Sequence, residues 1–317
     1  MNNEPKVSVI LPMYNEPVEW VVECLESLIN QTFQQFEIIA ILDNPNNYTL
    51  INLLNEYKKK DERIIFKINE VNLGLPTSLN EAIKICKGKI IARIDADDIC
   101  FPNRLELQYE YLNNNKNIDL IGGNFIKIDE NGNVLEEKIK RVMQHKSIIK
   151  YLKFGQPMAH PTWMGKTYVF KTLNYNNLLS VEDMDFLCRA VLQGYKLANI
   201  PEVIIKYRVR QLSLSRKNSL KQIIYTRYIG KVYKQALLKS KEYSVKKISD
   251  FHISQENIKC YERAEECFAK LVVDLKSNNY FKAVLKIPQA LLSSKYFQYK
   301  IIRRIMLNLI ISKEKSN

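Results

Sequence analysis

The chain has 317 residues, of which 46% are hydrophobic and 26% charged, with a formal net charge of +14. This length exceeds one average domain, and this composition is that of a globular protein with a real core rather than a disordered or fibrous chain. No stretch approaches the roughly 18 apolar residues of a membrane-spanning helix. The six cysteines form no Cys-x-x-Cys pair, and the first ten residues, MNNEPKVSVI, do not resemble a signal peptide. We therefore expect a cytoplasmic protein.

The first hundred residues alternate between short β-rich runs and helical patterns. Strands are predicted over residues 7–11, 38–42, 64–68 and 89–94, and helices over 18–29, 48–60 and 78–87. This alternation predicts βαβ units and a mostly parallel sheet with helices on both faces, in a Rossmann-like α/β fold.

The next hundred residues are less regular. A helix is predicted near 105–112, a strand over 118–121, a second helix over 184–193 and a strand over 203–209, and Asn131-Gly132 is a strong hairpin signal. Residues 140–180 are expected to be irregular, since the segment contains prolines within Gln156–Pro161.

The last third of the chain differs in charge and pattern. Residues 1–215 contain equal numbers of acidic and basic side chains, so the whole excess of +14 lies in residues 216–317. From Ser219 onward the apolar residues have helical spacing, with Pro288 inside the last stretch and a possible helical hairpin over 256–292. We therefore predict one domain over 1–216 and a basic helical region over 217–317.

Three polar clusters follow predicted strands of the first half. They are Pro12 with Tyr14, Asn15 and Glu16; Asp43; and Asp95 with Asp97 and Asp98. In open α/β sheets, ligands bind at the carboxyl edge of the strands. We therefore expect the clusters to meet at one site.

The third cluster places carboxylates at positions i and i+2. Mg²⁺ and Mn²⁺ prefer such hard oxygen ligands, usually one or two carboxylates completed by phosphates and water. Taken alone, Asp-x-Asp is more often a solvated acidic turn. Its position directly after the apolar run Ile90-Ile91-Ala92 favours a site for a divalent cation.

Seven segments together resemble the family 2 glycosyltransferases of the GT-A fold. They are VSVILPMYNE from residue 7, EIIAILD from 37, NLGLPTSLNEA from 72, ARIDADDICFPNR from 92, HPT from 160, EDMDF from 182 and YRVRQLSLS from 207. The resemblance covers about residues 5–216 and leaves the C-terminal hundred residues outside it. It implies that the predicted domain over 1–216 is catalytic, with a nucleotide-binding half over about 1–100 and an acceptor half over about 101–216. It implies an inverting enzyme of bacterial surface-polysaccharide assembly that uses a nucleotide-diphosphate sugar.

The resemblance also implies a function for individual residues. It implies that Pro12, Tyr14 and Glu16 bind the base and ribose, that Asp43 binds the uracil edge, and that Asn72 and Gly74 line the same pocket. It also implies that Asp95 contacts the ribose and the metal, and that Asp97 binds the metal on the diphosphate. It assigns proton abstraction to Asp183 and the diphosphate and acceptor side to His160, Glu182 and Arg208. The implied cofactor is Mn²⁺ or Mg²⁺.

The chemistry agrees with these assignments. Direct displacement needs a carboxylate that accepts the proton of the attacking hydroxyl, and a cation that stabilises the charge of the leaving diphosphate. Structural alternatives exist for each residue. Ser180 and Asp183 could form a capping box, His160 could be a satisfied loop histidine, and Arg208 and Arg210 could form surface ion pairs.

Two positions depart from the family pattern. A single acid, Asp43, follows Leu42 where many members have two acids, which weakens the prediction of uridine as the base. Arg210 stands where a histidine often follows the Tyr-Arg pair, so metal dependence could be weaker here.

The basic helical region has two interpretations. Residues 281–311 combine apolar residues at helical spacing with lysines and arginines, which is typical of a helix lying on an anionic membrane. The same pattern fits a helix packed on the catalytic domain with solvated lysines.

We expect a nucleotide-sugar donor, a glycan or lipid-linked acceptor, and a location at the inner face of the cell membrane. The alternatives are a nucleotidyltransferase, a non-catalytic sugar-nucleotide-binding homologue and, more remotely, a basic nucleic-acid-binding protein. The loop after the first strand lacks the glycines that a nucleotidyltransferase needs, and no nucleic-acid motif is present. Nucleic acid is therefore not an expected partner.

Overall fold

The computed structural model describes residues 4–178, 180–210, 219–239, 241–245, 248, 251, 253–277 and 279–315. The boundary predicted at residue 216 lies outside these described residues. Within them, no helix is both long enough and apolar enough to cross a membrane.

The first half forms the predicted parallel βα units. The strands β1 (Val7–Met13), β2 (Phe36–Leu42), β3 (Ile64–Ile68) and β4 (Ile90–Arg93) pair in parallel in the order β3-β2-β1-β4. The connecting helices are α1 (Val18–Ile29), α2 (Tyr48–Lys60) and α3 (Leu75–Ile85). All residues of β1 and β2 are buried, as expected for strands covered on both faces.

The sheet continues into the second half with mixed pairing. The order beyond β4 is β8 (Met164–Lys166), β6 (Leu120–Ile128), β9 (Leu197–Arg208) and β5 (Ile99–Cys100), with β7 (Val134–Ile139) paired to β6. β8 is antiparallel to both β4 and β6, whereas β6 and β9 are parallel. The predicted hairpin is confirmed: β6 and β7 are antiparallel, and Gly132 between them has φ of +86°, a conformation that glycine adopts without strain. Helix α4 (Arg104–Asn114) follows β5 along the chain.

The prediction that residues 140–180 are irregular is wrong. They contain α5 (His145–Tyr151), the 3₁₀ turn η1 (His160–Thr162), β8 and α6 (Thr167–Leu173). Each element is at most seven residues long, which is too short to display a helical or strand period. After α7 (Glu182–Leu192), β9 also begins six residues before its predicted start.

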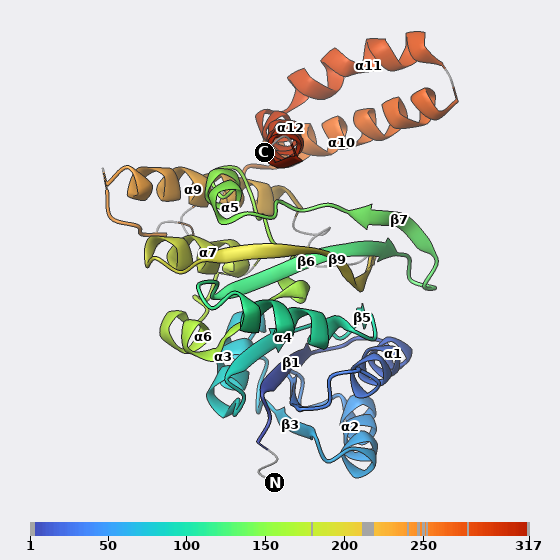
Figure 1. Cartoon of the computed structure of the whole chain (residues 1–317). Helices are drawn as coiled ribbons and strands as arrows, with labels where there is room; N and C mark the ends of the chain where they lie inside the picture. Colours follow the sequence, from blue (N-terminus) through green and yellow to red (C-terminus); the bar gives the residue numbers. More distant parts are fainter. Residues whose placement is uncertain are drawn as a thin grey trace.

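The chain ends in four helices, α9 (Ser219–Leu237), α10 (Gln255–Lys276), α11 (Tyr280–Ser293) and α12 (Lys295–Lys315). The predicted helical hairpin is present as α10 and α11, which lie side by side and project from the body of the molecule (Figure 1). Helix α9 contacts α7, so part of the C-terminal region packs on the α/β body.

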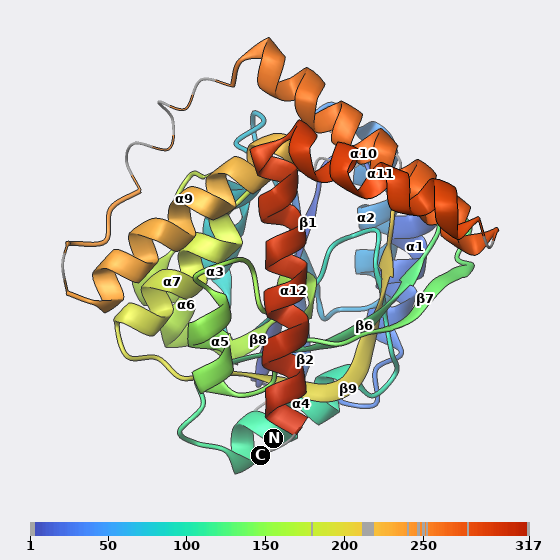
Figure 2. The same ribbon diagram turned by 90° about the horizontal axis from the view of Figure 1, so that it is seen from above.

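Helix α12 packs on the body along one face (Figure 2). Phe297, Leu307 and Ile310 are buried, and the Tyr299 hydroxyl donates a hydrogen bond of 2.8 Å to the carbonyl of Phe154. The Glu314 carboxylate accepts from the backbone N–H groups that begin the α5 segment, at 2.9 Å. The packing alternative therefore holds for this face, while other apolar side chains of α12 remain exposed.

Candidate active site

The carboxyl ends of β1, β2 and β4 meet at one edge of the sheet, because the three strands are adjacent and parallel. Pro12 lies in β1, and the loop after the strand contains Tyr14 and Glu16. The backbone N–H of Tyr14 donates to the Glu16 carboxylate at 2.7 Å, and the Tyr14 side chain is 43% exposed. Burial raises the pKa of Glu16, which the Tyr14 N–H and the charge of Arg210 partly oppose. The loop thus presents an accessible aromatic ring beside a carboxylate.

Asp43 is buried and organises the neighbouring loop. Its carboxylate accepts hydrogen bonds from the backbone N–H groups of Leu73 and Gly74 and from the Asn69 amide, each 2.8 Å long. Gly74 has φ of +80°, which disfavours any residue with a side chain, and its N–H also bonds the Asn72 side chain at 3.0 Å. The structure thus brings Asp43, Asn72 and Gly74 together. Much of the hydrogen-bonding capacity of the Asp43 carboxylate is used to hold the loop that contains Asn72 and Gly74.

Asparagines that the sequence analysis did not assign to the site connect the same loops. Asn44 and Asn47 both donate from their side chains to the Asn15 side-chain oxygen, at 2.6 and 3.3 Å. Asn47 also caps α2 by accepting from the N–H of Leu50. Asn69, which is 2% exposed, was missed although it follows β3 directly, as Asp43 follows β2.

Three carboxylates converge after β4. Single oxygen atoms of Asp95, Asp97 and Asp98 lie within 4.8 Å of one another. Burial, reinforced by Asp95, raises the pKa of Asp97 to about 7, and Arg210 opposes this rise. Burial and the two neighbouring aspartates hold the pKa of Asp98 well above its usual range. Close carboxylates in a buried site favour a cation.

Arginines form ion pairs with two of these carboxylates. Arg93, at the end of β4, pairs with Asp95 through both terminal nitrogens, and the Arg210 Nε atom lies 2.7 Å from an oxygen of Asp97. The Arg208 guanidinium differs: its Nε donates to the backbone carbonyl of Asp97 at 2.9 Å, and its other nitrogens bond Glu23 and the Glu130 carbonyl. Arg208 therefore fixes the end of β9 to this turn, and Arg210 is the arginine beside the carboxylate.

The donor set fits a divalent cation. One oxygen of Asp98 is buried without a hydrogen-bond partner in the described part of the chain, and Asp95 retains about a third of its side-chain exposure. Hard carboxylate oxygens at this spacing match the preference of Mg²⁺ and Mn²⁺. Arg210 occupies the Asp97 oxygen that such an ion would use.

The acceptor-side acids begin helix α7. Asp183 accepts hydrogen bonds from the Gln156 amide at 2.7 Å and from the N–H of Met184 at 2.6 Å. Burial raises the pKa of Asp183, and these two bonds oppose the rise. Val181 is the N-cap of α7 and makes no side-chain cap, so the alternative of a Ser180 capping box is not what the structure shows.

Glu182 differs from its neighbour. It is only 6% exposed, and one of its oxygens is buried without a partner among the residues described. Burial, with the charge of Asp183, raises the pKa of Glu182 to about 8. At neutral pH the proton is therefore held on this pair, and Asp183 is the more exposed of the two carboxyls.

His160 lies inside the protein. Its Nε2 atom is 2.9 Å from the Tyr175 hydroxyl, and its ring packs on Trp163 with centroids 4.5 Å apart. Burial and the charge of Arg93 hold the pKa of His160 well below its usual range, so its imidazole is neutral. The geometry is that of the satisfied loop histidine.

Arg93 connects the two groups of acids. Its charge acts on Asp95 and Asp98 at the end of β4 and on Glu182 and Asp183 at the start of α7. The sequence analysis missed Arg93, which is 3% exposed. The available signal was a lone arginine within the apolar run that ends in the acidic cluster. Gln156 was missed because it lies in the segment without periodicity.

Replacing Glu182 with glutamine should raise the melting temperature by about 5 °C at pH 8.5 and change it little at pH 5. Between the unfolded pKa near 4.5 and the folded value of about 8, the folded protein keeps a proton that the unfolded chain releases. Stability contributed by this group is therefore present at low pH and lost as pH rises, and glutamine removes that loss. Thermal unfolding at both pH values tests this, with exposed Glu62→Gln as the control. Equal shifts at both pH values would contradict it.

Comparison with known proteins identifies the class. Residues 8–173 match the family model described as glycosyl transferase family 2, and the chain belongs to that family. The family prediction from the sequence is confirmed.

Particular relatives agree. An uncharacterized glycosyltransferase of Methanocaldococcus jannaschii is 41% identical over 232 residues, which are 73% of this chain and 80% of the relative. The amylovoran biosynthesis glycosyltransferase AmsE of Erwinia amylovora is 32% identical, over 63% of this chain and 75% of its own. The O-antigen biosynthesis glycosyltransferase WbnJ of Escherichia coli is also 32% identical, over 66% and 82%.

Solved structures show the same fold. Residues 1–349 of S. aureus TarS in complex with UDP align with a TM-score of 0.56 and 18% identity, over 92% of this chain and 91% of that one. The complex with UDP-GlcNAc aligns with the same TM-score and 16% identity, over 94% and 91%. At these identities the likeness concerns the fold alone, and the predicted GT-A fold with a C-terminal helical extension is confirmed.

Proposed function

We propose that this glycosyltransferase transfers a sugar, with inversion, from a UDP-sugar to a hydroxyl of a glycan or lipid-linked glycan in polysaccharide biosynthesis. The observation that carries the proposal is the ion pair of Arg93 with Asp95 of the β4 carboxylates, together with the electrostatic interaction of Arg93 with the α7 acids. The similarity to glycosyltransferases of amylovoran and O-antigen biosynthesis, AmsE and WbnJ, supports the pathway class, and the UDP and UDP-GlcNAc complexes of TarS support the donor class.

The donor nucleotide would lie at the ends of β1 and β2. Tyr14 offers an exposed ring for the base, and Glu16 a carboxylate for the ribose, beside Pro12. Asp43 acts there mainly by holding the loop of Asn72 and Gly74 in place, with its remaining acceptor capacity available to the base.

The diphosphate would lie over the β4 carboxylates. Asp97 and Asp95 would hold Mn²⁺ or Mg²⁺, which when bound stabilises the negative charge that develops on the leaving diphosphate. Arg210 gives up Asp97 in this arrangement and offers its guanidinium to a phosphate oxygen, a charge-assisted contact. Arg208 keeps its backbone contacts and maintains the shape of the turn.

The attacking hydroxyl would meet Asp183, which takes its proton as the bond to the sugar forms. The Gln156 amide orients this carboxylate. Glu182, next to Asp183, keeps its proton. The neutral imidazole of His160 positions the Tyr175 hydroxyl by a hydrogen bond behind these acids.

The reaction would take place at the inner face of the cell membrane. The excess positive charge of residues 216–317 and the exposed apolar side chains within 281–311 support a peripheral contact with anionic lipid. In this proposal the domain boundary stays near residue 216, and the C-terminal helices attach the catalytic body to the membrane surface.

Isothermal titration with UDP tests the donor assignment. We expect binding with Mn²⁺ and its loss after EDTA, because the paired acids need a cation before they can meet a diphosphate. Tighter binding of GDP or dTDP than of UDP would contradict the choice of base. A screen of UDP-sugars for hydrolysis would then identify the sugar, with heat-denatured protein as the control.

A further inference from the structure

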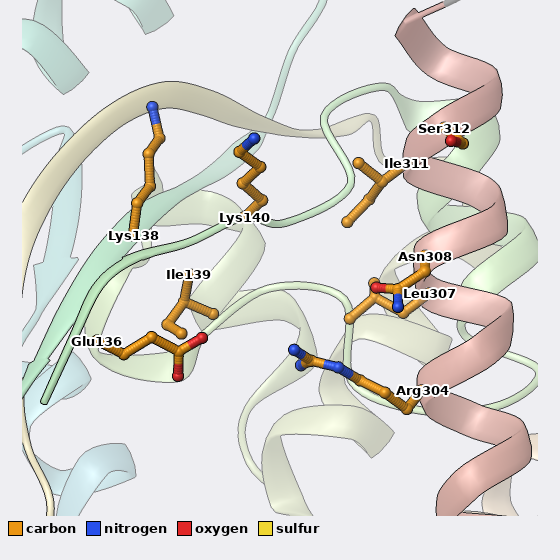
Figure 3. Close-up of a pocket in the computed structure, with 9 residues that line it drawn as sticks. All are labelled: Glu136, Lys138, Ile139, Lys140, Arg304, Leu307, Asn308, Ile311 and Ser312. Carbon is orange, nitrogen blue, oxygen red and sulfur yellow. The ribbon is translucent and has the colours of Figure 1, made fainter. Parts of the chain in front are cut away.

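A cavity of about 220 Å³ lies between β7 and α12, and it shares no residue with the candidate active site. Figure 3 shows Arg304 extending from α12 toward Ile139 and Glu136 of the β7 segment, with the Lys138 and Lys140 side chains extending toward the upper edge of the view. The volume is below the roughly 300–1,000 Å³ of pockets that enclose drug-sized ligands, so it suits a small head group.

The charge of this cavity is mostly positive. Lys138, Lys140 and Arg304 line it, and Glu136 is the single carboxylate among the nine lining residues. Glu136 already pairs with Lys127 at 2.9 Å, so it is partly neutralised from outside the cavity. Lys138, Lys140 and Arg304 are all exposed, so their charged ends are accessible to an anion from solvent.

Arg141 and Arg303 add to the positive charge near this cavity. The charges of Arg303 and Arg304 act on Arg141, and together with burial they lower the pKa of Arg141. The Arg141 Nε atom is buried and has no hydrogen-bond partner within the described part of the chain. No salt bridge of Arg141, Arg303 or Arg304 is found among the described residues. Arg141, which follows Lys140 in the chain, therefore adds positive charge near the cavity without a carboxylate partner among the described residues.

Exposed apolar side chains of α12 and β7 lie near the cavity and indicate that a lipid could carry such an anion. Ile302, Ile305 and Leu309, spaced along α12, are 47–51% exposed. Val134 and Leu135, at the start of β7, are 55% and 58% exposed. Helix α12 therefore has a packed face, a face that lines the cavity and an exposed apolar face, as expected for a helix at the boundary between head groups and acyl chains.

We propose that the cavity formed by Lys138, Lys140 and Arg304 binds a phosphomonoester or diphosphate group, carried either by a lipid or by a free phosphate compound. Guanidinium and ammonium groups bind phosphate by charge-assisted hydrogen bonds. A lipid-borne phosphate would place the exposed face of α12 against the membrane and fix the height of the catalytic body above it. Phosphate binding in the cavity does not require sugar transfer. UDP titration of the same variants therefore distinguishes a failure of this proposal from a failure of the proposed function.

The test uses the full-length variant Lys138→Gln/Lys140→Gln/Arg304→Gln. The probes are glycerol 3-phosphate in isothermal titration, and flotation with phosphatidylcholine vesicles that contain either phosphatidic acid or phosphatidylglycerol at equal surface charge. The control is Lys59→Gln/Lys87→Gln/Lys171→Gln, which removes three charges from exposed lysines of the α/β body. UDP titration and melting temperature establish that both variants are folded.

We expect wild type and control to prefer phosphatidic acid vesicles, and the cavity variant to bind them about 100-fold more weakly, since each cation near an anionic surface strengthens binding by roughly fivefold. Loss confined to the vesicles assigns the phosphate to lipid. Loss confined to glycerol 3-phosphate assigns it to a free compound. The proposal is overturned if the cavity variant and the control bind both probes equally well, or if phosphatidylglycerol is bound as tightly as phosphatidic acid and glycerol 3-phosphate does not bind.

Discussion

Sugar transfer by the Asp183→Asn variant should fall about 1,000-fold, while UDP binds as in wild type. Asparagine preserves the size of the side chain and the contact with Gln156, but it cannot accept the proton of the attacking hydroxyl. General-base catalysis of this kind contributes roughly 10²–10⁴-fold. Radiolabelled transfer and UDP titration of the same preparation measure the two quantities.

Asp185, two residues further along α7, provides the matched control. It is completely buried and bonds Arg189, Asn176 and Tyr243, so it is a structural carboxylate. Asp185→Asn should lower the melting temperature, because the partly buried Arg189 loses its charged partner. Unchanged transfer in Asp183→Asn would assign the proton to another group, and the Glu182→Gln variant would then be assayed in its place.

Asp97→Ala should abolish the metal-dependent part of UDP binding, weakening it at least 100-fold in the presence of Mn²⁺. The variant removes one of the three carboxylates of the β4 cluster and leaves Arg210 without its carboxylate. Loss even of residues that only support metal ligands costs about 10–100-fold in affinity, so loss of a ligand costs at least that much. Titration with UDP, with and without Mn²⁺, measures the effect.

Glu56→Ala is the control for this variant, because Glu56 is exposed on α2 and its loss removes the same charge far from the site. A variant that retains full Mn²⁺-dependent binding would show that the aspartates do not hold a metal, and that Arg210 alone meets the diphosphate. Metal-independent binding by wild type with the same affinity would support that alternative as well.

The fold was predictable where local pattern and tertiary environment agree. The strands β1 and β2 are mostly apolar runs between polar turns, and buried parallel strands need such runs. The hairpin at Asn131-Gly132 was predictable because glycine relieves the strain of a positive φ. The elements between residues 140 and 180 were not, because they are short and held by contacts with distant residues. β8, for example, pairs with both β4 and β6.

The candidate site was predictable in its acids but not in its cations. Asp43, Asp97 and Asp183 follow strands or begin a helix, and polar residues at those places are visible in a sequence. Arg93 belongs to a buried strand, where an arginine looks like an exception until the structure shows its ion pair with Asp95 and its electrostatic interaction with Glu182. Arg208 and Arg210 are two residues apart, and only their contacts distinguish the one bonded to backbone from the one beside Asp97.

The amino-acid sequence by itself determined the family, the parallel βα half, the acidic residues of the site and the concentration of positive charge in the last third. These properties are local, since they depend on residues that are near neighbours in the chain. Only the tertiary structure decided which acids share a site, which arginine meets which acid, and that α12 lies over a basic cavity formed with β7. These properties depend on distances between residues as far apart as 138 and 304, which the chain sets only when it packs.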